Sequence, residues 1–321
     1  MPPSSRVTAL LGPAFVVLAV AIGSLNALQA RVNGELGFLT GDGYVAALIS
    51  ITSGFAIVAT VMAFSPRGRQ GLGRVVTAVK TRELAGWHVL GGVSGAYYAI
   101  AQTLTGVLLG VALFSVAIVA GQTATSLLMD RWGVGPGGKF PLTVPRVVGT
   151  VLVLVAVIVA VGGQVDADAP VLWAWMPLLA GAGMGWQLAV NGRVRVTADS
   201  VLSATFLNFA IASVLLAVIV GVRFVLLGDI PAIPTNPLLY TGGVLGALFI
   251  AGSALVVKRI GVLVLGISVV AGQLMGALAI DVVLPSPLHP LTWVTVVGVA
   301  IALVAVALSG WPTKKNHPLG W

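Results

Sequence analysis

The chain has 321 residues, of which 58% are hydrophobic and only 8% are charged, and its mean hydropathy is +1.07. This composition excludes a water-soluble globular protein and is typical of a polytopic membrane protein. The net charge is +8, and the chain has no cysteine, which excludes disulfides and thiolate metal ligands.

Ten apolar windows of about 20 residues recur along the chain, each long enough to cross a hydrocarbon core of roughly 30 Å. In chain order they are 9–30, 44–64, 85–104, 107–129, 142–161, 172–190, 201–222, 238–257, 262–280 and 291–308. The sequence therefore predicts an all-α integral membrane protein with ten transmembrane helices. The first window also has the pattern of a secretory signal, but a motif at its end returns inside the second half, which favours a permanent span.

The charged residues are divided unequally between the two sides of the membrane. If the N-terminus is cytoplasmic, fifteen of the seventeen basic residues lie in cytoplasmic segments, and only Arg31 and Arg223 lie outside. The acidic residues assigned to the outside are Glu35, Asp42, Asp166, Asp168, Asp229 and Asp281. The positive-inside rule then predicts that both termini are cytoplasmic (N-in/C-in). The basic surplus is therefore a topology signal, and no nucleic-acid partner is expected.

Short motifs of the first half return in the same order in the second half. The matches are "LQARVNG" (28–34) with "WQLAVNG" (186–192) at a shift of 158, "GGVSG" (91–95) with "GGVLG" (242–246) and "VAGQ" (119–122) with "VAGQ" (270–273) at 151, and "PLT" (141–143) with "PLT" (290–292) at 149. We interpret them as a duplication into repeats 1–165 and 166–321, each with five spans. Because five is odd, the second repeat must be inverted, as is usual in alternating-access transporters.

Three of these motifs also point to a family. They are "Q-x-x-V-N-G" at the end of the first span, "ALIS" (47–50) with "FLN" (206–208), and "V-A-G-Q-x-x-x-x-L-x-x-D". They resemble the YdcZ-type branch of the drug/metabolite transporter superfamily, with two five-span units fused head to tail. The resemblance implies a ten-helix transporter of small solutes in the bacterial inner membrane. The related small multidrug exporters exchange protons through a glutamate in the first span, whereas no carboxylate lies inside the first or sixth span here.

Polar side chains inside membrane spans are costly unless satisfied, so they mark helix interfaces or a solute path. The candidate substrate-binding residues are Asn26, Gln29, Asn33, Tyr98, Gln102, Gln122, Trp186, Gln187, Asn191 and Gln273. Depth along the spans predicts two layers, Gln29 with Gln273 toward the outside and Gln187 with Gln122 toward the cytoplasm, with a solute between them. Alternatively, the amides only hold helices together, and the two asparagines near span ends could simply cap them.

Glycines four residues apart, at 91/95, 106/110, 242/246 and 272/276, have the spacing of close helix contacts. Asp130 and Asp281 each end a span, where a negative charge opposes the helix dipole, and this repeated choice predicts structural ion pairs. The expected partners are Arg31 and Arg223 for Asp281, and Arg131, Arg193 and Arg195 for Asp130. Proton coupling at the aspartates is the alternative.

The sequence contains no H-E-x-x-H, G-x-S-x-G or P-loop motif and no carboxylate pair within a span. We therefore expect no enzymatic activity, no cofactor and no metal, with energy supplied by a gradient or by the solute itself. The leading hypothesis is a secondary transporter that exports a small organic solute by alternating access, as a monomer or homodimer in contact with membrane lipid. The alternatives are an uncoupled facilitator, and a non-transporting scaffold or lipid scramblase-like protein.

Overall fold

The computed structural model describes residues 3–139, 141–162, 173–228, 231, 233–285 and 291–309. Within these ranges the regular structure is entirely helical. The elements are α1 (Pro3–Thr40), α2 (Gly43–Ala63), α3 (Pro66–Lys80), η1 (Gly86–Leu90), α4 (Gly91–Trp132), α5 (Val144–Gly162), α6 (Trp175–Ala198), α7 (Val201–Leu227), η3 (Pro237–Tyr240), α8 (Gly242–Val283) and α9 (Trp293–Ser309). The predicted repeat boundary at 165/166, with Asp166 and Asp168, lies outside the described residues, as does Asp229.

Helices that can span a membrane make up most of this part of the chain. Five segments are long and apolar enough by themselves, namely 14–40, 43–63, 86–132, 201–227 and 265–283, and shorter apolar helices cover 144–160, 237–249 and 293–308. Polar caps mark where some of them begin. Asp42 accepts hydrogen bonds from the backbone N–H groups of Tyr44 and Val45 at the start of α2, and Ser200 caps α7 in the same way.

The longest apolar segment is too long for one crossing, and a glycine breaks it. Gly110, inside α4, has φ +72° and ψ +157°, a conformation that essentially only glycine adopts. It divides α4 into a first arm, 91–109, and a second arm, 111–132, each about 30 Å long. The sequence predicted two spans here with a gap at 105–106, and it assigned Gly110 to close helix packing. The structure instead makes Gly110 the turning point.

α8, although a single helical element, also doubles back. Gly252 packs against Ile22 of α1, and Val269 packs against the neighbouring Gly23. In a straight helix these two α8 residues would be about 25 Å apart. Because both touch the same turn of α1, α8 must reverse its direction between them. We call the parts before and after this reversal the first and second arms of α8.

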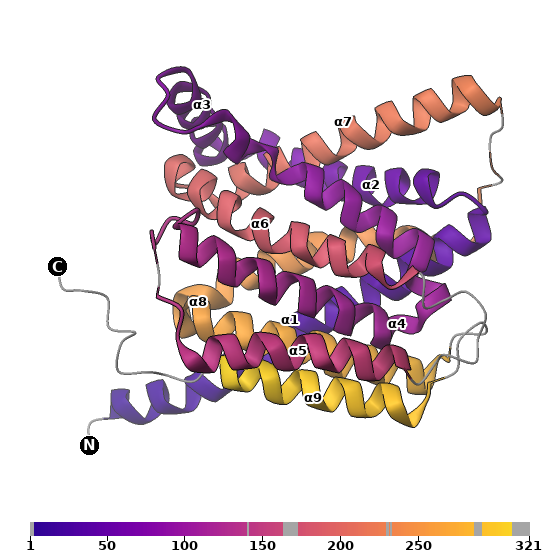
Figure 1. Cartoon of the computed structure of the whole chain (residues 1–321). Coiled ribbons are helices and arrows are strands. Elements are labelled where there is room, and N and C mark those ends of the chain that lie inside the picture. Colours follow the sequence, from indigo (N-terminus) through magenta and orange to yellow (C-terminus); the bar gives the residue numbers. More distant parts are fainter. Residues whose placement is uncertain are drawn as a thin grey trace.

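The helices lie alongside one another in one bundle (Figure 1). α4 packs mainly on α6, α1 mainly on α8, and α5 pairs with α9 along one side. One buried apolar cluster joins α1, α2, α4, α6, α7 and α8, and another joins α4, α5, α8 and α9. α2 and α7 are also neighbours, so helices from both halves of the sequence contribute to the centre.

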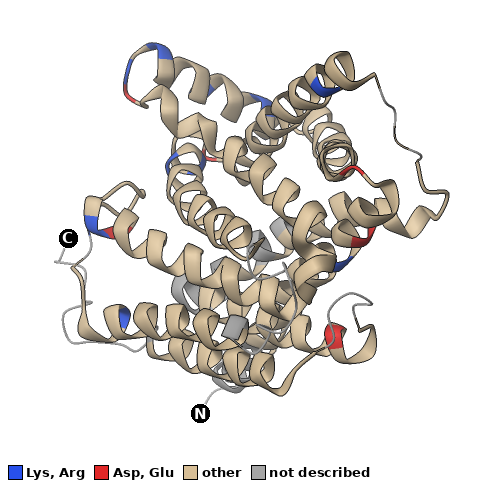
Figure 2. Ribbon diagram, turned by 45° about the vertical axis from the view of Figure 1, so that its right-hand side comes forward, with Lys and Arg blue, Asp and Glu red and all other residues tan. Residues whose placement is uncertain are grey.

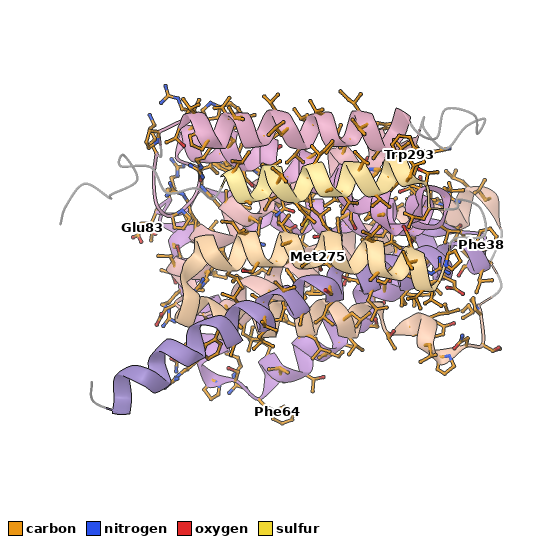
Figure 3. The ribbon with its side chains drawn as sticks, turned by 90° about the horizontal axis from the view of Figure 1, so that it is seen from below. Phe38, Phe64, Glu83, Met275 and Trp293 are labelled. Atoms are coloured by element: carbon orange, nitrogen blue, oxygen red, sulfur yellow. The ribbon has the colours of Figure 1, made fainter. Side chains whose placement is uncertain are left out.

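The outer surface of the bundle suits a lipid environment. The charged residues gather toward the helix ends, with long uncharged ribbons between them (Figure 2). Large apolar side chains project outward, as Phe64 does at 84% exposure and Trp293 at 77% (Figure 3). Exposed apolar surface on this scale marks contact with membrane or partner. Together with the spans above, it establishes a helical membrane protein.

Candidate functional site

The predicted amides gather in two places, and the first is where α1, α2 and α4 meet the start of α8. Its members are Gln29, Asn33, Ser50 and Gln102, and we call them the first amide cluster. Asn33 Nδ2 donates a hydrogen bond to Gln102 Oε1 at 2.8 Å, and these two side chains are 0% and 1% exposed. Asn33 therefore lies inside α1 and does not cap its end.

Two glycines of α8 make room for this cluster. A Cβ atom on Gly242 would collide with Asn33 Oδ1 and would lie 2.8 Å from Ser50 Oγ. A Cβ atom on Gly246 would lie 3.0 Å from Gln29 Nε2. The polar atoms of α1 and α2 thus pack directly against the backbone of a helix from the other half of the chain.

The second amide cluster lies where α6 and α7 meet the start of α4, and its members are Gln187, Asn191 and Asn208. A Cβ atom on Gly91 would lie 2.6 Å from Asn191 Oδ1 and 3.0 Å from Asn208 Oδ1. A Cβ atom on Gly95 would lie 3.3 Å from Gln187 Nε2. The arrangement is that of the first cluster, with the roles of the two halves exchanged.

The two sets of contacts follow the shifts found in the sequence. The members of the second cluster stand 158 residues after Gln29, Asn33 and Ser50, and the two glycine pairs are 151 residues apart. Backbone contacts follow the same rule. Gly121 packs against the carbonyl oxygen of Leu178, and its equivalent Gly272 packs against that of Val20. In the same way, Gly92 packs against the carbonyl oxygen of Asn208, and its equivalent Gly243 packs against that of Ser50.

Several buried polar atoms of the clusters have no hydrogen-bond partner within the described part of the protein. They are Asn33 Oδ1, Ser50 Oγ, Gln102 Nε2, Gln187 Oε1 and Asn208 Oδ1. Buried polar groups are normally paired, and an unpaired one is most costly in an apolar medium. The clusters therefore retain hydrogen-bonding capacity that the helix contacts do not use.

Gln122 and Gln273 occupy matching positions in the second arms of α4 and α8. Gln122 lies in the α4–α6 contact, where its backbone carbonyl faces Gly185. Gln273 is 3% exposed and lies beside the α1–α8 contact at Gly272. Among the described residues, no hydrogen bond joins Gln29 to Gln273 or Gln187 to Gln122. The two polar layers, Gln29 with Gln273 and Gln187 with Gln122, therefore remain a prediction.

The other predicted site residues surround the two clusters. Tyr98 is buried one turn before Gln102, and its ring is tilted against Phe114, 6.3 Å away in the second arm of α4. Trp186 stacks on Trp87 of η1 at 6.4 Å between ring centroids. Asn26 is half-buried on α1, one turn before the first cluster.

The structure gives Asp281 backbone partners in place of an ion pair with a predicted arginine, although the charge of Arg31 still acts on it. Its Oδ1 accepts from the N–H of Val111 at 3.0 Å, and its Oδ2 accepts from the N–H of Ala112 at 2.7 Å. The break at Gly110 frees these N–H groups, and a carboxylate satisfies them as a helix N-cap does. This geometry cannot be foreseen while the fourth span is treated as a separate, ordinary helix.

The predicted basic partners make other ion pairs. Arg31 lies 3.5 Å from Glu35, one turn later in α1, and Arg223 lies 3.1 Å from Asp42. Arg223 also lies over the ring of Tyr44, 4.5 Å from its centroid.

Asp130 is paired, but with Arg146 of α5. Arg193, one of its predicted partners, instead donates to the carbonyls of Gly133 and Val134 after α4. Those carbonyls lie just past the end of α4, where the negative end of the helix dipole attracts a cation.

Sequence reasoning missed Ser50 and Asn208 as members of the site. Both occur in the quoted family motifs, and both stand at the shift of 158 that relates the predicted amides, which is the signal that could have identified them. Two surface hollows, of about 660 and 360 Å³, lie at helix ends beside Phe64 and beside Pro145. No amide of either cluster lines them.

Comparison with known proteins agrees with this architecture. A family model described as "Putative inner membrane exporter, YdcZ" matches residues 14–159 and again residues 172–308. A solved structure described only as "Crystal structure of protein" is similar, with a TM-score of 0.53 and 17% identity, over 92% of this chain and 95% of the other. At that identity, the likeness concerns the fold alone. No curated protein matches significantly.

Proposed function

The chain belongs to the YdcZ family of inner membrane exporters, and from that premise we propose that it exports a small organic solute by alternating access. Family membership and the apolar helices make it a multi-pass protein of the inner membrane and a member of a transporter family.

The architecture we propose has ten spans in two inverted repeats, 1–165 and 166–321, with both termini in the cytoplasm. Three observations support it. α3 is not among the apolar helices, and without it each half supplies three single helices and one helix that doubles back, which makes five crossings in each half. One family model matches the chain twice, and the contacts around the amides repeat at the shifts seen in the sequence. An odd number of crossings then inverts the second half.

The observation that carries the function is the pair of amide clusters. Gly91, which packs against the second cluster, and Gln102 of the first cluster lie about 16 Å apart along one arm of α4, so the clusters sit at different depths. Each cluster packs polar groups of one half against a glycine of the other half. In an alternating-access cycle, one such contact opens to one side of the membrane while the other stays sealed.

We propose that the solute binds between the clusters. Gln29, Gln187, Gln122 and Gln273 would be its main contacts, with Asn26, Asn33, Asn191, Tyr98, Gln102 and Trp186 around them. A lining of uncharged amides and aromatic rings suits a small neutral or zwitterionic solute, or a cation with delocalised charge. α6 contains no carboxylate, and the one in the first span, Glu35, is paired with Arg31. This favours, as the second candidate, a facilitator that couples to no ion.

The test begins with the purified protein, whose thermal unfolding is followed in the presence of amines, amino acids and nucleosides. A compound that raises Tm is then tested for transport in proteoliposomes. We expect Gln122→Ala and Gln273→Ala to reduce both responses while Tm without solute stays near the wild-type value. Gln70→Ala, on the exposed face of α3, is the matched control.

Two results would contradict the proposal. If the two variants lose folding in proportion to transport, the glutamines only hold helices together. If the protein moves lipid between leaflets but moves none of the compounds that bind, the scramblase alternative replaces transport.

A further inference from the structure

The contact between Asp281 and the break in α4 joins the two halves of the chain. Asp281 ends α8 and is 6% exposed, and each of its carboxylate oxygens accepts one backbone N–H at the start of the second arm of α4. A Cβ atom on Gly110 would lie 3.2 Å from Asp281 Oδ2. The carboxylate thus closes the helix end that the glycine opens.

The sequence contains a second aspartate and a second glycine at positions equivalent to Asp281 and Gly110. A shift of 151 places Asp281 on Asp130 and Gly110 on Gly261, which lies within the stretch where α8 reverses. In this conformation Asp130 does not repeat the contact. It pairs with Arg146, and the two side chains are 32% and 27% exposed.

We propose that Asp281 and Asp130 are two latches that engage in turn during the transport cycle. In the present state, Asp281 caps the second arm of α4 and seals the end of the molecule that holds the first amide cluster. In the opposite state, Asp130 leaves Arg146 and caps the second arm of α8 after Gly261, while Asp281 withdraws. This inference rests on the proposed alternating access and names the contacts that would hold each of its two states.

The electrostatics explain why one latch at a time suffices. A carboxylate in the last turn of its own helix is opposed by that helix's dipole, whereas the first N–H groups of another helix attract it. Those N–H groups need an acceptor in an apolar medium. Each latch therefore stabilises its own state strongly. Opening a latch breaks a pair of charge-assisted hydrogen bonds, and only closing the other latch replaces them.

The unequal partners explain which state the structure adopts. The residue equivalent to Arg146, at the shift of 149 found for this region, is Thr295, which is 2% exposed and uncharged. Asp130 therefore has a basic partner outside its latch, and Asp281 has no equivalent one on α9. This difference favours the state in which Asp281 is latched and Asp130 is paired.

Hydrogen–deuterium exchange of the full-length protein in nanodiscs tests the proposal, because the latch bonds are backbone amides. Arg146→Gln frees Asp130, which lies at the opposite end of the second arm of α4 from the Asp281 contact. We expect it to speed exchange in the peptide that contains Val111 and Ala112 by about tenfold, the effect of one charge-assisted hydrogen bond on the population of the state. Exchange just after Gly261 should slow in the same variant.

Two further variants separate the latch from a local disturbance. Arg193→Gln removes an arginine at the same end without touching Asp130, and it should leave exchange at Val111 unchanged. Adding Asp130→Asn to Arg146→Gln removes the competing latch and should restore the wild-type rate.

An Arg146→Gln variant with wild-type exchange at Val111 would overturn the latches. If solutes still stabilise that protein and are still transported, the proposed function survives this failure. If Arg146→Gln and Arg193→Gln act alike, the effect is a general loosening of that end, and the latch proposal is also wrong.

Discussion

Asn33 of α1 donates a hydrogen bond to Gln102 of α4 across 2.8 Å, and both side chains are almost completely buried. Each residue also keeps one buried polar atom without a hydrogen-bond partner in the described part of the protein. A pair that only held helices together would be expected to use its full capacity. The remaining donor and acceptor are what a solute contact or a gate would require.

A double-mutant cycle on this pair measures its strength. Interhelical hydrogen bonds in membrane proteins contribute about 0.6–1.7 kcal/mol. We expect Asn33→Ala and Gln102→Ala to be coupled by that amount in unfolding measurements, because each variant removes the same bond. Strictly additive effects would show that the 2.8 Å contact contributes nothing to the sealed state.

Gly242→Ala and Gly91→Ala test the equivalence of the two clusters. Each added methyl group meets an asparagine Oδ1, that of Asn33 in one case and that of Asn191 in the other. We expect each to lower the free energy of unfolding by about 1–3 kcal/mol through overpacking and to impair transport.

Gly221→Ala is the control for this pair, because a Cβ atom there meets nothing within 4 Å. It should be neutral or slightly stabilising, since alanine is the better helix former. If the two cluster variants behave like the control, the close approach of glycine to the amides is not important.

Gly110→Ala tests the turning point of α4. Its φ of +72° is strained for any residue with a Cβ atom, and the new methyl group would also press on the Asp281 carboxylate. We expect a loss of about 1–3 kcal/mol in the free energy of unfolding. Gly266→Ala in α8, which meets nothing within 4 Å, should show no such loss in the same denaturation assay.

Reporters of sidedness test the proposed topology. A reporter fused after Lys315 should be active in the cytoplasm, and one inserted near Asp166 should be active outside. This follows because five crossings separate the N-terminus from the connector and five more separate the connector from the C-terminus. Activity of both reporters on the same side would rule out the inversion.

The sequence predicted the helical membrane class and the family, because hydropathy and the quoted motifs do not depend on tertiary contacts. The shift of 158 is likewise a property of the sequence, and it pairs Gln29 with Gln187. It could not identify Gly242 and Gly91 as neighbours of the amides. Those contacts join segments far apart in the chain, and a glycine in an apolar helix has no pattern of its own.

The ends and partners of helices were harder to predict for a physical reason. The first apolar window stops at residue 30, but α1 continues to Thr40, and Arg31 and Glu35 pair along its surface. The partner of Asp281 could not be found by matching charges, because it is a pair of backbone N–H groups that become free only where Gly110 breaks α4.

Single cysteines test the central claim most directly, and the chain has none of its own to interfere. Gln29→Cys and Gln187→Cys are each treated with a membrane-impermeant thiol reagent from either side of oriented vesicles. Alternating access between inverted repeats predicts labelling of residue 29 from outside and of residue 187 from the cytoplasm. It also predicts that any solute or variant that raises the labelling rate at one of these residues lowers the rate at the other. Labelling of both from the same side, or rates that rise and fall together, would contradict it.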